Sequence, residues 1–354
     1  MALLKELLMC MSKDRHRLRN DIQRAFKSDS SDLNKSSDAL DSLAVRIRKS
    51  KKCAEERRLK LPSVTFPQEL PISQHWEELS TLIQKNPVVI ICGETGSGKS
   101  TQIPKICLAA GFGAKGMICQ TQPRRIAARS VAERISAEIG SQLGEHAGYR
   151  VRFSEQISDA NYLRVLTDGM LLAEFEKDRY LSRYEVLIVD EAHERTLNID
   201  FLLGLSKRIL KSRPEFRLII TSATLDTEKF SHHFAGAPAV TVSGRTYPVE
   251  RRYRPVEAGE SGVDSLPQAI GAAIEELHKE RLGDVLVFLP GEREIRETAS
   301  WLEKQTKGGL EILPLYSRLP LRSSIVYFML AVIPASYLRP MWRKPRSRYP
   351  AFDM

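Results

Sequence analysis

The sequence has few cysteines, and none of them belongs to a recognisable site. No CxxC pair and no cluster of cysteine with histidine occurs in the 354 residues. This scarcity excludes a disulfide framework and a thiolate metal centre, and it suits a reducing cytoplasm. Three of the five lie in or beside apolar runs, where a buried thiol is expected. The cysteines are Cys10, Cys53, Cys92, Cys107 and Cys119.

The sequence also has no apolar run long enough for a membrane helix. The apolar part of the N-terminus is too short for a signal peptide and lacks a small-residue cleavage site. Residues 325–338 are apolar but contain Pro334, and about 14 residues are too few to span a bilayer as a helix. We therefore expect a cytoplasmic protein without membrane contact, and we expect it to be a monomer.

The middle of the sequence lacks an excess of positive charge, although the net charge is +10. Residues 1–60 contain 16 Lys/Arg against 9 Asp/Glu, and residues 322–354 contain 6 against 1. Residues 61–321 therefore carry a net charge of −2. A nucleic acid that binds the middle of the chain must consequently be held by individual arginines and not by a general positive field.

The first 69 residues are predicted to form a basic helical region. Their apolar residues recur at helical spacing, and a Ser/Asp-rich stretch at 28–37 separates two such segments. A basic helix of this kind is usually a solvated surface, and RNA contact is the alternative. Residues 61–71 contain three prolines and are predicted to be a linker.

From residue 70 onward, short apolar runs alternate with longer helical segments. Such runs, bounded by Gly, Pro or acidic residues, are typical of strands buried on both faces of a parallel sheet. The alternation predicts a doubly wound α/β domain at 70–243 and the start of a second one at 244–321. The predicted strands of the first domain are 88–92, 116–119, 185–190 and 217–223, and those of the second are 284–290 and 311–316.

The strongest motif follows the first of these strands. Its eight residues fit G-x-x-x-x-G-K-[ST] and precede a helical segment, which is the setting of a phosphate-binding loop. Glycines let backbone amides approach phosphate oxygens, and the helix N-terminus adds a favourable dipole. Lys99 is predicted to neutralise the β- and γ-phosphates of ATP, and Ser100 to hold Mg²⁺. The motif comprises Gly93, Glu94, Thr95, Gly96, Ser97, Gly98, Lys99 and Ser100.

Two further motifs follow later strands. Asp190 and Glu191 end an apolar strand, which is where ligands bind in open α/β sheets. Given the phosphate-binding loop upstream, we assign Asp190 to the Mg²⁺ shell and Glu191 to the attacking water, with helix capping as the alternative. Ser222 and Thr224 end the next strand. They are predicted to couple the nucleotide site to a neighbouring surface, or else to form a turn.

Seven segments then follow one another in an informative order: GETGSGKS, TQPRRIAA, TDGMLL, DEAHERTLNIDFLLG, SATL, VSGRTYPVE and FLPGEREI. Together they resemble the DEAH-box RNA helicases, and the bacterial HrpA type most closely. The resemblance runs from about Leu70 to Leu321. It implies a RecA-like nucleotide-binding domain, an incomplete second RecA-like domain, and an ATP-dependent RNA helicase activity that uses ATP and Mg²⁺. It also implies that the catalytic residues are Lys99, Asp190, Glu191 and His193.

The resemblance further implies a site for single-stranded RNA, contacted mainly through its backbone. In such helicases the TQPRR segment, the TDG segment and a loop like 148–153 meet the RNA. Arg134 falls where the family stacks an arginine on the adenine. For any one of these arginines, a surface ion pair is the alternative. The implied RNA-binding residues are Thr121, Arg124, Arg125, Arg152, Thr167 and Asp168.

The family pattern stops at Leu321. The segment TNVAETSLT and the arginine-finger motif, which such helicases have beyond this point, do not follow. Codons chosen to suit the tail encode TNVAETSLT in the neighbouring frame, so residues 322–354 are predicted to be an unstructured frameshift product. The gene sequence beyond the Leu321 codon tests this prediction. Because arginines of the second lobe assist hydrolysis, we expect nucleotide binding, feeble RNA-insensitive hydrolysis and no strand separation.

Two other functions fit the sequence. One is a non-enzymatic fragment that binds nucleotide or RNA, and the other is a P-loop NTPase that acts on DNA. Replacing Lys99 by alanine distinguishes the first, because in a binding fragment the loss of this lysine changes nothing measurable beyond binding. The resemblance of the TQPRR and TDG segments favours RNA over DNA.

Overall fold

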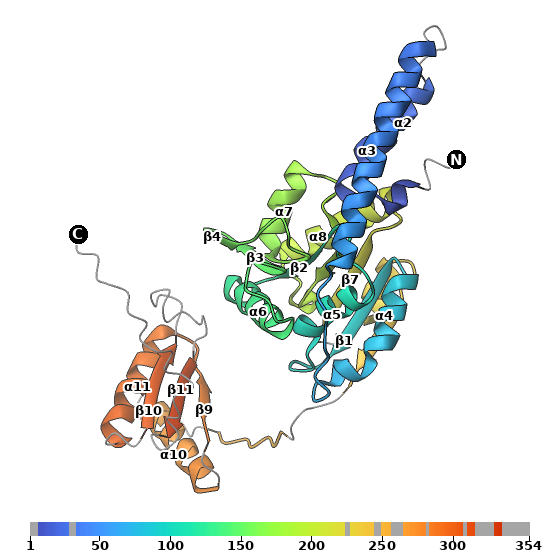
Figure 1. Cartoon of the computed structure of the whole chain (residues 1–354). Coiled ribbons are helices and arrows are strands. Elements are labelled where there is room, and N and C mark those ends of the chain that lie inside the picture. Colours follow the sequence, from blue (N-terminus) through green and yellow to red (C-terminus); the bar gives the residue numbers. More distant parts are fainter. Residues whose placement is uncertain are drawn as a thin grey trace, which may run out of the picture. The chain divides into compact units, whose positions relative to one another are not determined.

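The chain is divided into two structural units, Met1–Pro248 and Val249–Met354, which are described separately (Figure 1). The computed structural model describes residues 6–27, 33–223, 227–243, 249–255, 265–280, 283–306, 310–315 and 329–334. The boundary between the units lies five residues beyond the predicted junction at residue 243. The N-terminal helical region belongs to the first unit, together with the nucleotide-binding motifs.

The first unit is built on an eight-stranded sheet with the order β4-β3-β5-β2-β6-β7-β1-β8. Every neighbouring pair is parallel except β3 and β4, which are antiparallel. The strands are β1 Val88–Gly93, β2 Met117–Gln122, β3 Ala147–Val151, β4 Ser154–Gln156, β5 Leu163–Thr167, β6 Tyr184–Val189, β7 Arg217–Ser222 and β8 Ala239–Val242. Strands β1, β2, β6 and β7 confirm the four strands predicted from apolar runs.

Helices cover both faces of this sheet, so the unit has three layers. Successive strand residues point to opposite faces. Val89 and Ile91 of β1 therefore belong to the apolar core completed by α4, α5 and α6, whereas Ile90 and Cys92 belong to the core completed by α7, α8 and α9. The helices are α4 Trp76–Lys85, α5 Lys99–Ala109, α6 Arg125–Glu138, α7 Asp168–Lys177, α8 Leu197–Ser212 and α9 Thr227–His233. This arrangement confirms the doubly wound, RecA-like fold.

The carboxyl ends of the parallel strands meet at one edge of the sheet. β1 ends at Gly93, β7 at Ser222, and β6 directly before Asp190. Because β7 lies between β1 and β6, the loops after three adjacent strands come together there. β2 and β5 continue the same edge and end at the TQPRR segment and at Asp168. The fold thus gathers the predicted motifs on one side of the sheet.

The N-terminal residues form a helical hairpin, called here the arm (residues 6–27 and 33–59). It consists of the short 3-10 helix η1 Leu7–Met9, followed by α2 Ser12–Lys27 and α3 Leu33–Leu59 (Figure 1). Its helices agree with those predicted from the apolar spacing. Its own small core comprises Leu7, Cys10, Leu18, Ile22, Leu43 and Ile47.

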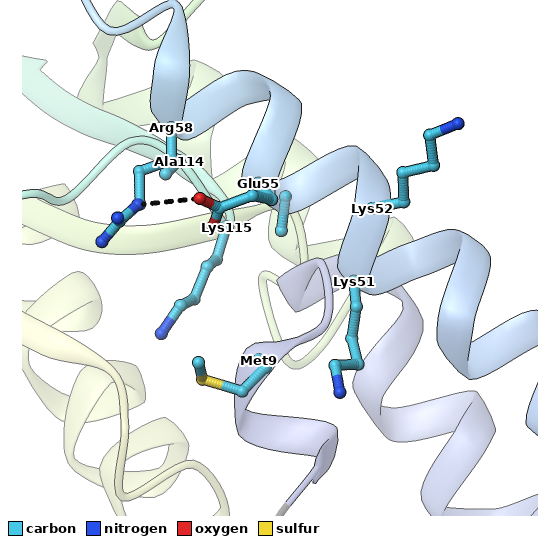
Figure 2. Close-up of a pocket in the computed structure, with 8 residues that line it drawn as sticks. Met9, Lys51, Lys52, Glu55, Arg58, Ala114 and Lys115 are labelled. Atoms are coloured by element: carbon cyan, nitrogen blue, oxygen red, sulfur yellow. Dashed lines mark ion pairs between the residues drawn. The ribbon is translucent and has the colours of Figure 1, made fainter.

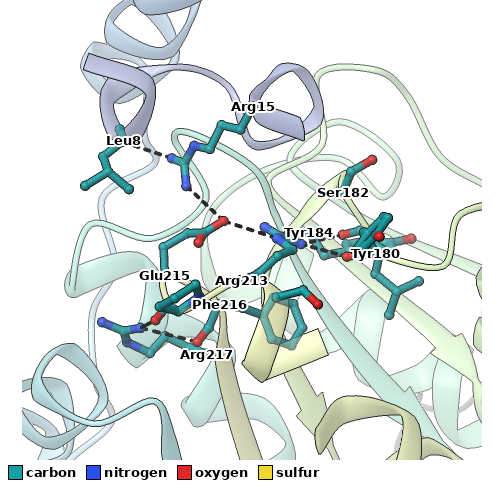
Figure 3. Close-up of polar contacts among 12 residues, drawn as sticks. Leu8, Arg15, Tyr180, Ser182, Tyr184, Arg213, Glu215, Phe216 and Arg217 are labelled. Carbon is teal, nitrogen blue, oxygen red and sulfur yellow. Dashed lines mark hydrogen bonds and ion pairs between the residues drawn. The ribbon is translucent and has the colours of Figure 1, made fainter. Parts of the chain in front are cut away.

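A buried ion-pair network joins the arm to the sheet. Arg15 on α2 is buried, and its Nη1 lies 3.5 Å from Glu215 Oε1 (Figure 3). The same carboxylate oxygen lies 3.2 Å from Nε of Arg213. Burial by itself raises the pKa of Glu215, but hydrogen bonding and the two facing guanidinium groups outweigh it, so that the pKa is lowered. Glu215 is therefore a charged bridge between the arm and the segment that leads into β7.

Replacing Arg213 by alanine is expected to destabilise the first unit by about 2–3 kcal/mol. Arg213 is buried, and its loss leaves Glu215 with Arg15 as its one guanidinium partner and removes the side-chain donor to three backbone carbonyl oxygens. Chemical denaturation of the full chain measures the effect, with Arg208→Ala on the exposed face of α8 as the control. Equal stability of the two variants would contradict this account. The carbonyl oxygens belong to Tyr180, Leu181 and Tyr184.

The second unit contains a three-stranded sheet with the order β10-β11-β9. Its elements are α10 Ser265–Glu280, β9 Val285–Phe288, α11 Glu292–Thr306, β10 Leu310–Leu315 and β11 Met329–Pro334. Strands β9 and β10 confirm the two strands predicted here. The buried core joins both helices to the sheet and comprises Ile274, Leu289, Ile295, Ala299 and Leu302.

Strand β11 differs from the sequence-based expectation. Residues 329–334 lie in the segment predicted to be unstructured, yet they form the central strand of this sheet, antiparallel to both β9 and β10. Their sequence, MLAVIP, is apolar and contains β-branched residues, which favour a strand between two others. The prediction is therefore corrected for these six residues. Residues 322–328 and 335–354 lie outside the described part of the chain.

The predicted burial of cysteines in or beside apolar runs is confirmed. All five are free, and all except Cys53 are buried. Among the residues that the structure describes, no helix combines the length and the apolar character needed to cross a membrane.

Candidate nucleotide site and RNA-facing surface

The phosphate-binding loop has a backbone that requires glycine. Gly96 and Gly98 have φ values of 88° and 90°, in the left-handed region that favours glycine. A Cβ atom at Gly93 would lie 2.7 Å from the carbonyl oxygen of Val242 in β8, so a side chain there would push strand β8 away. Gly98 directly precedes α5, whose first residue is Lys99. The loop therefore leads straight into a helix N-terminus, as phosphate binding requires.

The Lys99 side chain lies inside this loop. Its Nζ donates hydrogen bonds to the carbonyl oxygens of Gly93 (2.6 Å) and Glu94 (2.8 Å) and to the Ser97 hydroxyl (3.1 Å). Burial lowers the pKa of Lys99, and the carboxylates of residues 190–191 oppose this effect. The ammonium group is thus held at the point where the loop and the DEAH segment approach each other.

Asp190 is fully buried and hydrogen-bonded on both carboxylate oxygens. Oδ2 accepts from Gln120 Nε2 at 3.0 Å and from Gln122 Nε2, both at the end of β2. Oδ1 accepts from the Thr221 hydroxyl on β7 and from the backbone N–H of Glu191 at 3.0 Å. Donors from two neighbouring strands therefore fix the orientation of this carboxylate.

The oxygen atoms available at this edge suit a magnesium ion. Gln120 also donates to the carbonyl oxygen of Ser100 at 3.0 Å, which ties the start of α5 to Asp190. A hydroxyl from Ser100 and a carboxylate from Asp190 are hard oxygen ligands, and Mg²⁺ prefers such ligands together with phosphate oxygens. The described residues contain no cluster of three or more His, Cys, Asp or Glu able to hold a metal alone. The residues present therefore fit Mg²⁺ bound together with a nucleotide.

Glu191 has a backbone that few non-glycine residues adopt. Its φ is 54° and its ψ is 39°, in the left-handed region, and such strain is often found at functional sites. Burial raises the pKa of its carboxyl, and the charge of Asp190 adds to the rise, while His193 and Lys99 oppose it. A half-buried carboxyl with a raised pKa is suited to accept a proton.

His193 connects the DEAH segment to the end of β7. Its Nδ1 lies 3.2 Å from the backbone N–H of Ala223 and 3.3 Å from Glu191 Oε2. Nδ1 accepts from Ala223 when it carries no proton, whereas it donates to Glu191 when it carries one. Ser222, one of the two predicted coupling residues, is buried beside this contact. The other, Thr224, lies outside the described residues.

Three arginines predicted to bind RNA are exposed near this edge. Arg124 precedes α6, Arg125 is its first residue, and Nη2 of Arg124 lies 3.4 Å from Glu194 Oε1. Arg152 lies between β3 and β4, with its guanidinium 4.8 Å from the ring centroid of Phe153, which is 88% exposed. These arginines are available to a ligand in solvent.

Three other residues predicted to bind RNA are less accessible. Thr121, near the end of β2, is fully buried, and Thr167 is half-buried. Asp168, the first residue of α7, is also buried. Burial raises the pKa of Asp168 to about 6, and the nearby carboxylates of Glu194 and Asp190 add to the rise. The side chains of Thr121 and Asp168 are therefore less accessible to a ligand than the three arginines, and their contact with RNA stays a prediction.

Arg134, predicted to stack on adenine, is exposed on α6. Its Nε lies 2.6 Å from Glu138 Oε1. Glu138 also accepts from the fully buried Lys105 (2.7 Å) and from Gln102 (2.8 Å), both on α5. Burial alone raises the pKa of Glu138, but these hydrogen bonds outweigh it and the pKa is lowered. The stacking role of Arg134 stays a prediction.

Sequence reasoning missed the side chains that hold Asp190. Gln120, Gln122 and Thr221 belong to no segment that was assigned to the nucleotide site. The only sequence signal was their position, because each is a polar residue near the end of an otherwise apolar strand. The pairing of β2 and β7 with β6 brings them to Asp190.

The proteins that are similar to this chain are helicases. Residues 74–231 match the family model of the DEAD/DEAH box helicase. The ATP-dependent RNA helicase HrpA of Escherichia coli (strain K12) is 54% identical over 260 residues, covering 73% of this chain and 20% of that protein. The ATP-dependent RNA helicase HrpA homolog of Haemophilus influenzae is 51% identical over 294 residues, covering 80% and 22%. The chain thus spans about a fifth of the length of these curated relatives.

A solved structure is also similar. The crystal structure of the Escherichia coli DEAH/RHA helicase HrpB superimposes with a TM-score of 0.64 at 35% sequence identity. The match covers 72% of this chain and 32% of that one.

Proposed function

We propose that this chain binds ATP with Mg²⁺, hydrolyses the ATP and binds single-stranded RNA, and the match of residues 74–231 to the DEAD/DEAH box helicase family model supports the proposal. The observation that supports this most strongly is the convergence of Lys99 and Asp190 at one edge of the sheet. A buried ammonium inside a glycine-rich loop faces a buried carboxylate that is held by three side chains. The names of the relatives HrpA and HrpB agree with this activity.

The residues divide the chemistry between them. Lys99 binds the negative charge of the β- and γ-phosphates, and the amides at the start of α5 bind phosphate oxygens. Ser100 and Asp190 would hold Mg²⁺, which when bound neutralises part of the phosphate charge. Glu191 orients a water molecule and accepts its proton on a carboxylate oxygen. The raised pKa of Glu191 makes this oxygen a better proton acceptor than an ordinary surface carboxylate.

The RNA-binding part of the proposal is supported by the exposed arginines. Arg124, Arg125 and Arg152 are exposed and would contact backbone phosphates, which carry most of the affinity of such complexes. The hydrogen bond from the Ala223 backbone N–H to His193 connects the nucleotide site to the end of β7. The expectation that hydrolysis by this chain is feeble and insensitive to RNA stays a prediction. ATP turnover with and without single-stranded RNA measures it, and a rise of more than several-fold would contradict it.

Replacing Arg124 and Arg125 together by alanine is expected to weaken RNA binding about tenfold and to reduce its salt dependence. Two lost phosphate contacts lower the slope of log K against log salt by about 1.4, at about 0.7 for each contact with a single strand. Fluorescence anisotropy of a labelled oligo(U) over a range of salt concentrations gives both numbers. ATP affinity should stay unchanged. An unchanged slope would contradict the assignment of these two arginines to the RNA site.

A further inference from the structure

A pocket of about 360 Å³ lies between the arm and the loop that precedes β2. Four cationic side chains line it, from α3 and from the loop. Figure 2 shows Lys51 and Lys115 reaching toward Met9 in this pocket, while Lys52 points outward. The four cations are Lys51, Lys52, Arg58 and Lys115.

The positive charge of this pocket is only weakly compensated. Glu55 is the one acidic side chain in its lining, and it lies 3.4 Å from Arg58. Lys51 lies 3.4 Å from Glu6 and Lys52 lies 3.9 Å from Glu56, in exposed pairs of the kind that contribute little energy. Lys115 has no hydrogen bond or ion pair with another side chain among the described residues. A net excess of positive charge therefore faces solvent here.

The pocket is held rigidly by contacts beneath it. The carbonyl oxygen of Lys115 accepts a hydrogen bond from the backbone N–H of Ser12 at 2.6 Å. Arg57, on α3, donates to the carbonyl oxygens of Gly113 (3.2 Å) and Asn161 (2.9 Å). Its guanidinium also lies 4.5 Å from the ring centroid of Tyr162. These contacts fix the distance between the cations of the arm and Lys115, the cation of the loop.

The place of the pocket in the fold separates it from the nucleotide site. Lys115 precedes β2, whereas Gln120, Gln122 and the TQPRR segment lie at the far end of the same strand. Six residues of strand span about 20 Å. The pocket is therefore at the opposite edge of the sheet from Asp190 and from Arg124.

We propose that this pocket, together with the basic face of α3, is a second RNA-binding surface that holds backbone phosphates. The exposed basic residues of α3 extend beyond the pocket through Lys49 and Arg48, over about 15 Å of helix. A surface of this length matches a chain of phosphates better than a single anion. The inference rests on the proposed RNA-binding function and adds a second contact, remote from the first.

The test compares three matched variants of the full chain. The first removes Lys51, Arg58 and Lys115 by alanine substitution. The control removes three exposed cations elsewhere, Lys85, Arg208 and Lys211, so that the change in net charge is identical. The third exchanges lysine and arginine at the pocket positions, as Lys51→Arg, Arg58→Lys and Lys115→Arg, which keeps the charge. Each is titrated with a labelled single-stranded RNA of about 30 nucleotides at several salt concentrations, and separately with inorganic pyrophosphate.

We expect the alanine variant at the pocket to bind RNA at least about fivefold more weakly and to lose about 2 from the salt slope, at about 0.7 for each contact. The control and the charge-keeping variant should stay within about twofold of the unmodified chain. Equal effects of the pocket and control variants would overturn the proposal. A pocket effect on inorganic pyrophosphate binding without any effect on RNA would also overturn it, since the ligand would then be a free anion.

The outcome is distinguishable from failure of the proposed function. If Arg124→Ala with Arg125→Ala changes nothing while the pocket variant weakens RNA binding, the first RNA site is wrong and the second stands. If the first weakens binding and the pocket variant does not, the proposed function stands and this inference fails. ATP affinity should be unaffected by the pocket variant, because Lys99 lies at the other edge of the sheet.

Discussion

Replacing Lys99 by alanine is expected to lower the affinity for MgATP by at least about a hundredfold, because it removes the one buried cation of the phosphate-binding loop. The ammonium group contacts two carbonyl oxygens and one hydroxyl of the loop, so its position is set before the nucleotide binds. Isothermal titration calorimetry with ATP measures the loss.

The control for this variant is Lys85→Ala, which removes an exposed lysine at the end of α4. Its ATP affinity should equal that of the unmodified chain, and its thermal unfolding should be unchanged. An affinity of Lys99→Ala within about threefold of the control would contradict the assignment of this loop to phosphate binding. If Lys99→Ala binds ATP weakly and the unmodified chain shows no hydrolysis, the non-enzymatic binding fragment becomes the better account.

Replacing Glu191 by glutamine is expected to slow ATP hydrolysis about a thousandfold and to leave ATP affinity within a few-fold of its original value. The amide keeps the size of the side chain but does not accept a proton from water. Single-turnover hydrolysis of radiolabelled ATP separates this step from binding. Glu176→Gln, an exposed carboxylate on α7, is the matched control and should hydrolyse ATP normally.

The pH dependence gives a second readout of Glu191. Its pKa is raised by burial and by Asp190, so protonation begins at a higher pH than for an ordinary glutamate. Because only the deprotonated carboxylate accepts a proton, hydrolysis should fall as the pH drops through this raised pKa. The residual rate of Glu191→Gln should lack this fall. A variant that retains both the rate and the pH dependence would assign the proton acceptor to another residue.

Much of the first unit could be predicted because its strands are buried on both faces. β1, β2, β6 and β7 are apolar runs between residues that break structure, and the sheet confirms each. β5 was missed because its run is short and is interrupted by Arg164, which is nevertheless buried. β8 was missed because at the sheet edge only Val242 of its four residues is buried. A continuous apolar run indicates a buried strand, and neither β5 nor β8 has such a run in its sequence.

The site was predictable where local sequence sets the chemistry and not where the fold does. The loop around Lys99 and the pair Asp190–Glu191 carry their pattern within a few residues. The donors to Asp190 come from Gln120, Gln122 and Thr221, which are up to about a hundred residues apart, and only strand pairing brings them together. The contact between the arm and the sheet likewise depends on the fold, because Arg15 and Glu215 are far apart in the sequence.

Pairing across distant segments also explains the surprises at the two ends of the chain. No local pattern indicates that Arg15 meets Glu215. In the second unit, β11 comes from a segment whose sequence departs from the family pattern, but its six residues fit between β9 and β10 because they are apolar. Residual apolar character is enough to fill a strand position, whatever its origin.

The most direct test of the central claim is calorimetric titration of the full chain with ATP in Mg²⁺ and again in EDTA. The account predicts one saturable ATP site per chain in Mg²⁺, with affinity at least about tenfold weaker in EDTA. Asp190→Asn should abolish that difference, because its buried carboxylate is the charged side chain that we propose holds the ion. Absence of saturable binding, or equal affinities in Mg²⁺ and EDTA, would contradict the account.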